Sequence, residues 1–374
     1  MNKEWTQLWL RYEPGKDMGN GAFVNGVVLQ GFEAEQVVIQ SALSELERGV
    51  KGMLGIIPTF KTDSQKGTLK ISQNKQMKPE SYRLSVAEEC LLLEAADERG
   101  VLYGIFHILR MIAIEKPLAK MEVLCVPDNP LRMYNHWDNM DGSIERGYSG
   151  NSFFFEEGDI VIDERTQDYA RMAASIGING VVINNVNVKN EATWLITDRY
   201  FEKVAKMAEI FKKYGIKLYL SLNFAAPMEL GGPDCADPLN DEVIAWWKEK
   251  MAEVFAHIPN LGGFLVKADS EGRPGPFTYG RTQADGANML ADIVKPYGGI
   301  IIWRCFVYNC TQDWRDYKTD RARAGYDNFI EMDGDYHDNV ILQIKNGPMD
   351  FQIREAVSPL LGGLKKTNQM LEVQ

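Results

Sequence analysis

The chain has 374 residues, of which 45% are apolar and 25% are charged, an ordinary composition for a globular protein with room for two domains. The net charge of −11 argues against nucleic acid as the main partner, because such a partner requires a basic surface. No apolar run approaches the roughly 18 residues that a membrane-spanning helix needs, so no membrane partner is expected.

The cysteines and the N-terminus predict a cytoplasmic protein. The cysteines are odd in number and form no close pair, which is typical of free thiols in a reducing compartment; they are Cys90, Cys125, Cys235, Cys305 and Cys310. The first 14 residues lack the apolar core of a signal peptide. Neither these cysteines nor the four histidines have metal-ligand spacing, so we expect no metal and no other cofactor.

Residues 1–127 are predicted to be an accessory domain of the α+β type. Apolar residues at helical spacing predict helices at 34–54 and 97–113, and short apolar runs predict strands at 67–71, 82–86 and 90–95. Asp97 is expected to cap the second helix. His107 falls in the middle of that helix, and we interpret it as a structural residue rather than a catalytic one.

Residues 128–374 are predicted to form a (β/α)8 barrel, because strand, polar loop and helix repeat in that order after Pro127 and Pro130. The predicted strands are 132–137, 180–184, 217–222, 263–267, 299–306 and 340–344, and the predicted helices are 164–176, 199–214, 241–256, 281–294 and 320–331. Alternating units with apolar strands imply a parallel sheet. The fold class is therefore α/β, an incomplete barrel of about six units preceded by the accessory domain.

Polar residues follow each predicted strand, as expected at the C-terminal face of a barrel, where active sites lie. The densest polar run is 135–147, with two Asp, one Glu, one Arg, one His and Trp137 among thirteen residues. Such a run is typical of a ligand site at the end of an element. The alternative is a solvated loop, against which Trp137 and the three aromatic residues at 153–155 argue.

Three stretches resemble the α-glucuronidases of glycoside hydrolase family 67: HWDNMDGSIERGYSG at 136–150, VKADSEGRPGP at 266–276 and ILQIKNGPMDFQ at 341–352. The resemblance implies a hydrolase that releases (4-O-methyl)-D-glucuronic acid from α-1,2-linked xylooligosaccharides with inversion and without a cofactor. It implies glucuronoxylan-derived oligosaccharides as partners, and a homodimer is possible for a full-length protein.

Glu271 is the first candidate catalytic residue. In an extended strand Lys267, Asp269 and Glu271 share one side, and charged neighbours can tune the proton affinity of Glu271 in either direction. The alternative is a salt-bridged strand end. By resemblance, Glu271 matches the general acid of the family, which protonates the glycosidic oxygen and needs a raised pKa.

Asp350 is the second candidate catalytic residue. It follows Asn346, Gly347 and Pro348, a rigid turn that could orient one side chain. By resemblance, it matches a carboxylate that activates water. The family inverts configuration, so the two carboxyl groups should stand about 6.5–9.5 Å apart.

Lys267, Arg304 and Lys345 lie at the ends of three predicted strands. Buried cations require an anion, so three of them in an acidic protein indicate a carboxylate or phosphate ligand, unless they pair with internal Asp and Glu. By resemblance, these residues hold the glucuronate carboxylate. Trp137 matches an aromatic residue that packs on the sugar; the alternative for Trp137 is a place in the core.

The last residues, 368–374, read as the opening of a seventh strand, and a second candidate base of the family has no counterpart in this sequence. The chain is therefore expected to be the first part of a longer enzyme, poorly soluble and inactive alone. One alternative is a non-catalytic remnant that binds sugar acids. A further alternative is a barrel lyase or aldolase that forms a lysine imine with a sugar acid.

Overall fold

The computed structural model describes residues 10–62, 66–270, 272–305, 321–347, 352 and 354–374. The chain divides into two compact units. The first comprises Met1–Tyr134, Ile162–Gly180 and Glu209–Lys217, and the second comprises Asn135–Val161, Val181–Ala208 and Leu218–Gln374.

The first unit contains a mixed six-stranded sheet with the order β2-β1-β3-β5-β4-β6. Its strands are β1 Gly26–Gln30, β2 Thr59–Phe60, β3 Thr68–Gln73, β4 Tyr82–Ala87, β5 Cys90–Ala95 and β6 Glu122–Cys125. β1 runs parallel to β2 and β3, and β5 runs parallel to β3, whereas β4 is antiparallel to β5 and β6. The three predicted strands are confirmed; β1, β2 and β6 were not predicted.

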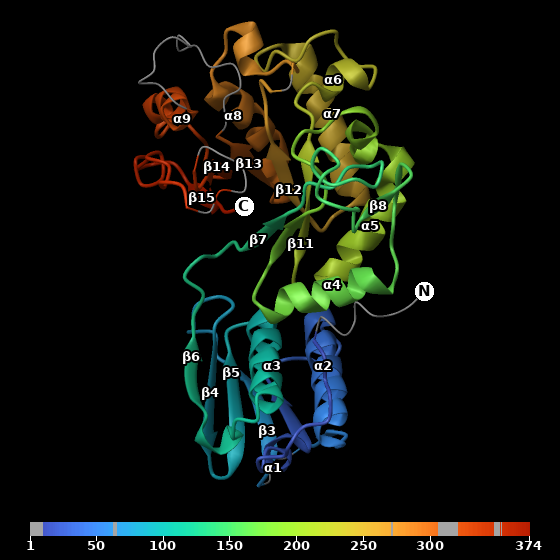
Figure 1. Ribbon diagram of the computed structural model, residues 1–374, viewed down its shortest axis with the longest axis vertical. Coiled ribbons are helices and arrows are strands. Elements are labelled where there is room, and N and C mark those ends of the chain that lie inside the picture. Colours follow the sequence, from blue (N-terminus) through green and yellow to red (C-terminus); the bar gives the residue numbers. More distant parts are fainter. Residues whose placement is uncertain (1–9, 63–65, 271, 306–320, 348–351, 353) are drawn as a thin grey trace. The chain divides into compact units, whose positions relative to one another are not determined.

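The helices of this unit are α1 Gly21–Val24, α2 Val37–Leu54 and α3 Glu98–Ala113, and α2 and α3 lie side by side (Figure 1). The predicted cap of α3 is confirmed, since the Asp97 carboxylate accepts hydrogen bonds from Gly100 N at 2.9 Å and from Glu80 N at 2.8 Å. His107 Nδ1 lies 2.8 Å from the Tyr82 hydroxyl, and burial lowers the pKa of this histidine. Both observations agree with a structural role for His107.

The second sheet has seven strands in the order β15-β14-β13-β12-β11-β10-β7. They are β7 Met133–Asn135, β10 Gly180–Val182, β11 Lys217–Leu222, β12 Leu261–Val266, β13 Ile300–Arg304, β14 Val340–Lys345 and β15 Gln369–Glu372. Each pair from β11 to β15 is parallel. The predicted seventh strand is confirmed as β15, and all six strands predicted before it are present: β11 has the predicted bounds, and one or both ends of the other five differ by one or two residues.

Helices alternate with these strands, as predicted. They are α4 Glu164–Ser175, α5 Asp198–Lys212, α6 Ala226–Glu229, α7 Asp241–His257, α8 Gln283–Val294 and α9 Arg321–Phe329. Two further strands, β8 Phe155–Glu156 and β9 Asp159–Ile160, form an antiparallel hairpin. Short 3-10 helices lie at Leu118–Lys120, Asn190–Ile196, Pro276–Tyr279, Lys295–Tyr297 and Ile330–Met332. This order of strands and helices confirms the predicted fold class.

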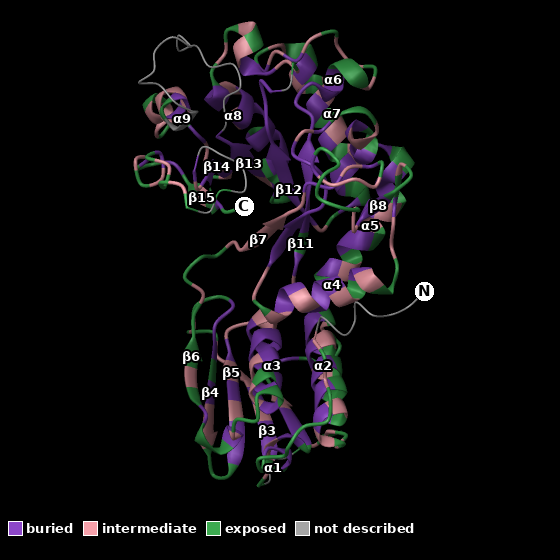
Figure 2. Ribbon diagram, in the orientation of Figure 1, coloured by how far each residue is buried: buried purple, intermediate pink, exposed green. Residues whose placement is uncertain are grey.

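The core of the second unit is its sheet, because β11 to β14 are buried along almost their whole length (Figure 2). The sheet curls: Asn135 at the end of β7 donates to Glu372 of β15 at 3.3 Å, although these two strands stand at opposite ends of the strand order. The described residues thus supply seven strands of an incomplete (β/α)8 barrel. None of the helices in the described residues combines the length and the hydropathy of a membrane span.

Candidate active site

Three buried cations lie at the C-terminal ends of neighbouring strands. Lys267 directly follows β12, Arg304 ends β13 and Lys345 ends β14, and their exposed fractions are 8%, 2% and 6%. Val266 pairs with Trp303 and Arg304 pairs with Gln343. Since paired residues and residues two apart share a face of a sheet, this register directs all three cations toward one face.

Glu372 of β15 joins this group. Its Oε2 accepts a hydrogen bond from Arg304 Nε at 2.9 Å, and it pairs with Lys345 in the register of β14 and β15. We name Lys267, Arg304, Lys345 and Glu372 the cationic cluster. Internal ion pairing, the alternative for these cations, holds for Arg304 with Glu372, and the three buried cations gather at this one face. Such a cluster suits an anionic ligand.

Trp137 borders the cationic cluster, because the Arg304 guanidinium lies over its ring at 5.0 Å. The indole is largely buried. The backbone oxygen of Trp137 accepts hydrogen bonds from Glu145 N at 2.8 Å and Asn185 Nδ2 at 3.2 Å, which fix this stretch beside the loop after β10. The structure thus brings Trp137 and Arg304 together, and the burial of the indole agrees with the alternative reading of Trp137 as a core residue.

Several polar residues of the run at 135–147 form hydrogen bonds that stabilise their own loop. The buried Asp138 carboxylate accepts from Ser152 Oγ at 2.6 Å and from Phe153 N at 2.8 Å. The buried Glu145 has a φ of 56°, in the left-handed region, and its backbone oxygen accepts from Asn139 Nδ2 at 2.8 Å. The solvated-loop alternative is therefore wrong for this part of the run.

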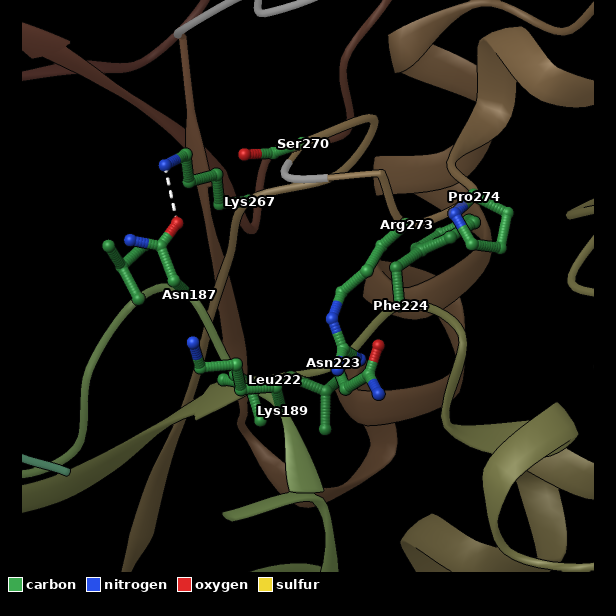
Figure 3. Close-up of a pocket in the computed structure, with 11 residues that line it drawn as sticks. Asn187, Lys189, Leu222, Asn223, Phe224, Lys267, Ser270, Arg273 and Pro274 are labelled. Atoms are coloured by element: carbon green, nitrogen blue, oxygen red, sulfur yellow. Dashed lines mark hydrogen bonds between the residues drawn. The ribbon is translucent and has the colours of Figure 1, made fainter. Parts of the chain in front are cut away.

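A cavity of about 160 Å³ lies between the ends of β10, β11 and β12 (Figure 3). Lys267 Nζ donates to Asn187 Oδ1 at 2.5 Å on one side of it, and Arg273 and Phe224 stand on the other. Asn187 N in turn donates to Asn185 Oδ1 at 2.8 Å. The loop after β10 thus contacts both Lys267 and the backbone of the Trp137 stretch.

The predicted catalytic residues Glu271 and Asp350 lie outside the described residues. The argument that placed Glu271 by strand alternation is wrong, because β12 ends at Val266 and Asp269 has a φ of 52°. The Asp269 carboxylate accepts hydrogen bonds from Gln283 Nε2 at 2.7 Å and from Phe277 N at 3.2 Å, so it stabilises the turn that follows β12.

Sequence reasoning missed Glu372, and it did not predict the contacts of Glu145 and Asn187. Glu372 could have been found from the alternation of the seventh strand, which places it beside Lys345. Glu145 and Asn187 lie in loops. Their positions depend on backbone dihedral angles that no periodic pattern in the sequence predicts. Within the described part of the chain, no three His, Cys, Asp or Glu side chains gather as a metal site.

Comparisons with known proteins show the family of this chain. Residues 111–374 match the model of the glycosyl hydrolase family 67 middle domain, and residues 8–108 match that of the family 67 N-terminus. Alpha-glucuronidase A of Emericella nidulans is 43% identical over 364 residues, covering 90% of this chain and 42% of the relative. Alpha-glucuronidase A of Aspergillus tubingensis is 38% identical over 383 residues, covering 98% and 45%.

Solved structures share the fold. A GH20 beta-N-acetylhexosaminidase from Streptomyces coelicolor superposes with a TM-score of 0.57 at 13% identity, covering 98% of this chain and 74% of that one. A family GH115 4-O-methyl-alpha-glucuronidase with specificity for decorated arabinogalactans gives 0.52 at 14% identity, covering 94% and 54%. At such identities the likeness concerns the fold alone.

The chain spans less than half the length of the two curated relatives described above. Its two family matches nevertheless cover residues 8–108 and 111–374, nearly the whole sequence. These matches span the six-stranded sheet of the first unit, the seven-stranded sheet of the second unit and the cationic cluster. The chain therefore belongs to glycosyl hydrolase family 67.

Proposed function

We propose that the complete protein is an α-glucuronidase that releases (4-O-methyl)-D-glucuronic acid from α-1,2-linked xylooligosaccharides with inversion. The observation that carries this proposal is the cationic cluster beside Trp137, in a chain of family 67 whose relatives are named alpha-glucuronidases. A glucuronosyl ring offers a carboxylate to Lys267, Arg304 and Lys345 and an apolar face to the indole.

The chemistry requires two carboxyl groups on opposite faces of the bond. We assign Glu271 as the general acid that protonates the leaving oxygen, and Asp350 as the base that activates water. β12 and β14, which precede these residues, are separated by one strand, β13. That spacing suits an inverting pair, which needs room for a water molecule between the carboxyl groups.

The names of the relatives favour hydrolysis over sugar-acid binding without turnover. The oligosaccharide partner, a homodimer of the full-length protein and a reducing cytoplasmic location stay predictions. Among the described residues, Cys125, Cys235 and Cys305 carry free thiols, which supports the predicted location.

The test compares two substrates in the Glu271→Gln variant of the full-length protein. The kcat/KM for aldotriouronic acid should fall by about 10²–10⁴-fold, the usual contribution of a general acid. An aryl α-glucuronide with an acidic phenol should lose much less, because its leaving group needs no proton. Glu331→Gln, an exposed change on the 3-10 helix Ile330–Met332, is the matched control. Equal loss on both substrates would remove Glu271 from the acid role.

A further inference from the structure

A buried chain of hydrogen bonds connects β13 and α8 to the turn that follows β12. Trp303 of β13, Gln283 at the start of α8 and Asp269 in the turn are its members, and all three are buried. Trp303 Nε1 donates to Gln283 Oε1 at 2.9 Å, and Gln283 Nε2 donates to Asp269 Oδ2 at 2.7 Å. Gln283 therefore joins the two residues through the two ends of one amide group.

The orientation of this amide follows from its neighbours. The indole N–H of Trp303 can only donate, so the oxygen of the Gln283 amide must face it. The amide nitrogen then faces Asp269, whose Oδ2 also accepts from Phe277 N at 3.2 Å. An apolar side chain at position 283 would leave both Trp303 and Asp269 with a buried polar group that lacks this partner, which is unfavourable.

The turn that this chain of hydrogen bonds supports has a strained and tightly folded backbone. Asp269 has a φ of 52°, in the left-handed region, which a residue other than glycine adopts at a cost. A Cβ on Gly275 would lie 2.4 Å from Asp269 N, so the chain returns closely onto Asp269. Strain of this kind is typical of functional sites, where the surrounding contacts maintain it.

We propose that Gln283 is a positioning residue for the general acid of the reaction. The inference rests on the proposed function, which assigns the acid role to Glu271. In the sequence, Glu271 lies between Asp269 and Gly275, the two residues whose close approach forms the turn. Gln283 thus fixes the backbone that carries the acid. A general acid must come within hydrogen-bond reach of the leaving oxygen, and a displacement of about 1 Å can lower the rate about 10²-fold.

The alternative is a structural role, in which the Gln283 amide only satisfies the buried Asp269. The two roles have different effects on different substrates. A loss of folded protein lowers the activity on every substrate alike, whereas a misplaced acid affects only substrates whose leaving group needs a proton. The deciding quantity is therefore the ratio of kcat/KM for aldotriouronic acid to kcat/KM for an aryl α-glucuronide with an acidic phenol.

The experiment measures this ratio in two variants of the full-length protein, each assayed below its own melting temperature. Gln283→Leu removes both hydrogen-bonding groups at similar volume. Gln283→Glu keeps an acceptor for Trp303, but its ionised carboxylate cannot donate to Asp269. We expect each variant to lose about 10–100-fold in kcat/KM for aldotriouronic acid and less than about threefold for the aryl substrate.

Asn288→Leu is the matched control, because Asn288 lies on the same helix and also uses both ends of its amide. Its Nδ2 donates to Asp335 O at 2.7 Å and its Oδ1 accepts from His337 N at 2.9 Å, in the segment before β14. This variant should keep the wild-type ratio even if its melting temperature falls. Equal losses on both substrates in the Gln283 variants would overturn the proposal, as would an unchanged ratio or a similar change of ratio in Asn288→Leu.

The Glu271→Gln variant separates this inference from the proposed function. If Glu271→Gln loses mainly the activity on aldotriouronic acid while the Gln283 variants keep the wild-type ratio, only the positioning role fails. If Glu271→Gln loses both activities equally, the acid assignment fails, and the positioning role fails with it.

Discussion

Arg304 makes the most specific contacts in the cationic cluster. Its side chain is buried, its Nε binds Glu372, and its guanidinium lies over the Trp137 ring. A lysine could keep the charge but not the planar stacking or the fork of donors that fits a carboxylate. The residue thus combines three functions in one group, an ion pair, an aromatic contact and a candidate ligand for the sugar carboxylate.

Replacing Arg304 should therefore impair substrate binding more than turnover. In Arg304→Ala the KM for glucuronosides should rise by one or more orders of magnitude, since a charge-assisted hydrogen bond contributes about 1.5–3 kcal/mol. Arg304→Lys should recover only part of the loss. Steady-state kinetics give both numbers.

The melting temperature of the same Arg304 samples is the necessary control, because the alanine variant leaves Glu372 buried without this ion pair. A neutral glucoside should be a poor substrate for every form of the protein. An Arg304→Ala protein that is folded and binds glucuronate as well as wild type would contradict the assignment.

Two histidines should make stability depend on pH. Burial lowers the pKa of His107 and of His136 below the ordinary value, with Arg110 reinforcing the first shift and Asp138 opposing the second. Between the lowered folded pKa and about 6.5, the unfolded chain binds more protons than the folded one. Stability should therefore fall as the pH is lowered from about 7.

His107→Gln isolates one of these contributions. Denaturant unfolding at several pH values between about 5 and 8 gives the free energy of unfolding as a function of pH. The slope of this free energy against pH should be shallower in the variant than in wild type, by at most about 1.36 kcal/mol per pH unit for one proton. The glutamine can still hydrogen-bond the Tyr82 hydroxyl that His107 contacts. Parallel curves for variant and wild type would show that His107 does not titrate in this way.

At the scale of elements, β12 and β13 approach so closely at one point that only glycine fits. Gly263 has a φ of 138°, and a Cβ there would lie 2.0 Å from Ile300 O of the neighbouring strand. Since the clash is with backbone, no rotamer change relieves it. This position ties the sequence of β12 to the register that places Lys267 beside Arg304.

Gly263→Ala should therefore lower the free energy of unfolding by about 3 kcal/mol or more, or prevent folding. Gly325→Ala is the matched control, because Gly325 lies inside α9 and a Cβ there meets nothing within 4 Å. That change should stabilise the protein by about 0.5–1 kcal/mol. Urea unfolding measures both, and a Gly263→Ala protein as stable as wild type would contradict the described register.

Most barrel strands could be predicted from sequence because they carry apolar runs, as β12 and β13 do. β1 carries a similar run at 27–29, so its pattern could have identified it as a buried strand. β6 could not be predicted in the same way, because its four residues are mostly exposed. Pairing with β4, rather than local pattern, makes β6 a strand.

The candidate site likewise contains residues that could be predicted from sequence and contacts that could not. Lys267, Arg304 and Lys345 follow from the rule that polar residues at the strand ends of a barrel meet at one face. The turn at Asp269 overrides strand alternation because its carboxylate is bound by Gln283, far along the chain. Neither that contact nor the one between Lys267 and Asn187 has a local signal in the sequence.

For the whole molecule, the net charge of −11 on this chain limits where a sugar acid can bind. Long-range electrostatics disfavour an anion near such a surface, so its binding must come from the local cationic cluster. Neutral glucose has no group that needs these cations. We therefore expect the protein to bind glucuronic acid in clear preference to glucose.

A crystal structure of the protein soaked with glucuronic acid would show which residues hold the sugar carboxylate. We expect the carboxylate to lie among Lys267, Arg304 and Lys345, with the ring against Trp137. Glucuronic acid bound elsewhere, or bound with its carboxylate turned away from all three cations, would contradict the proposed site.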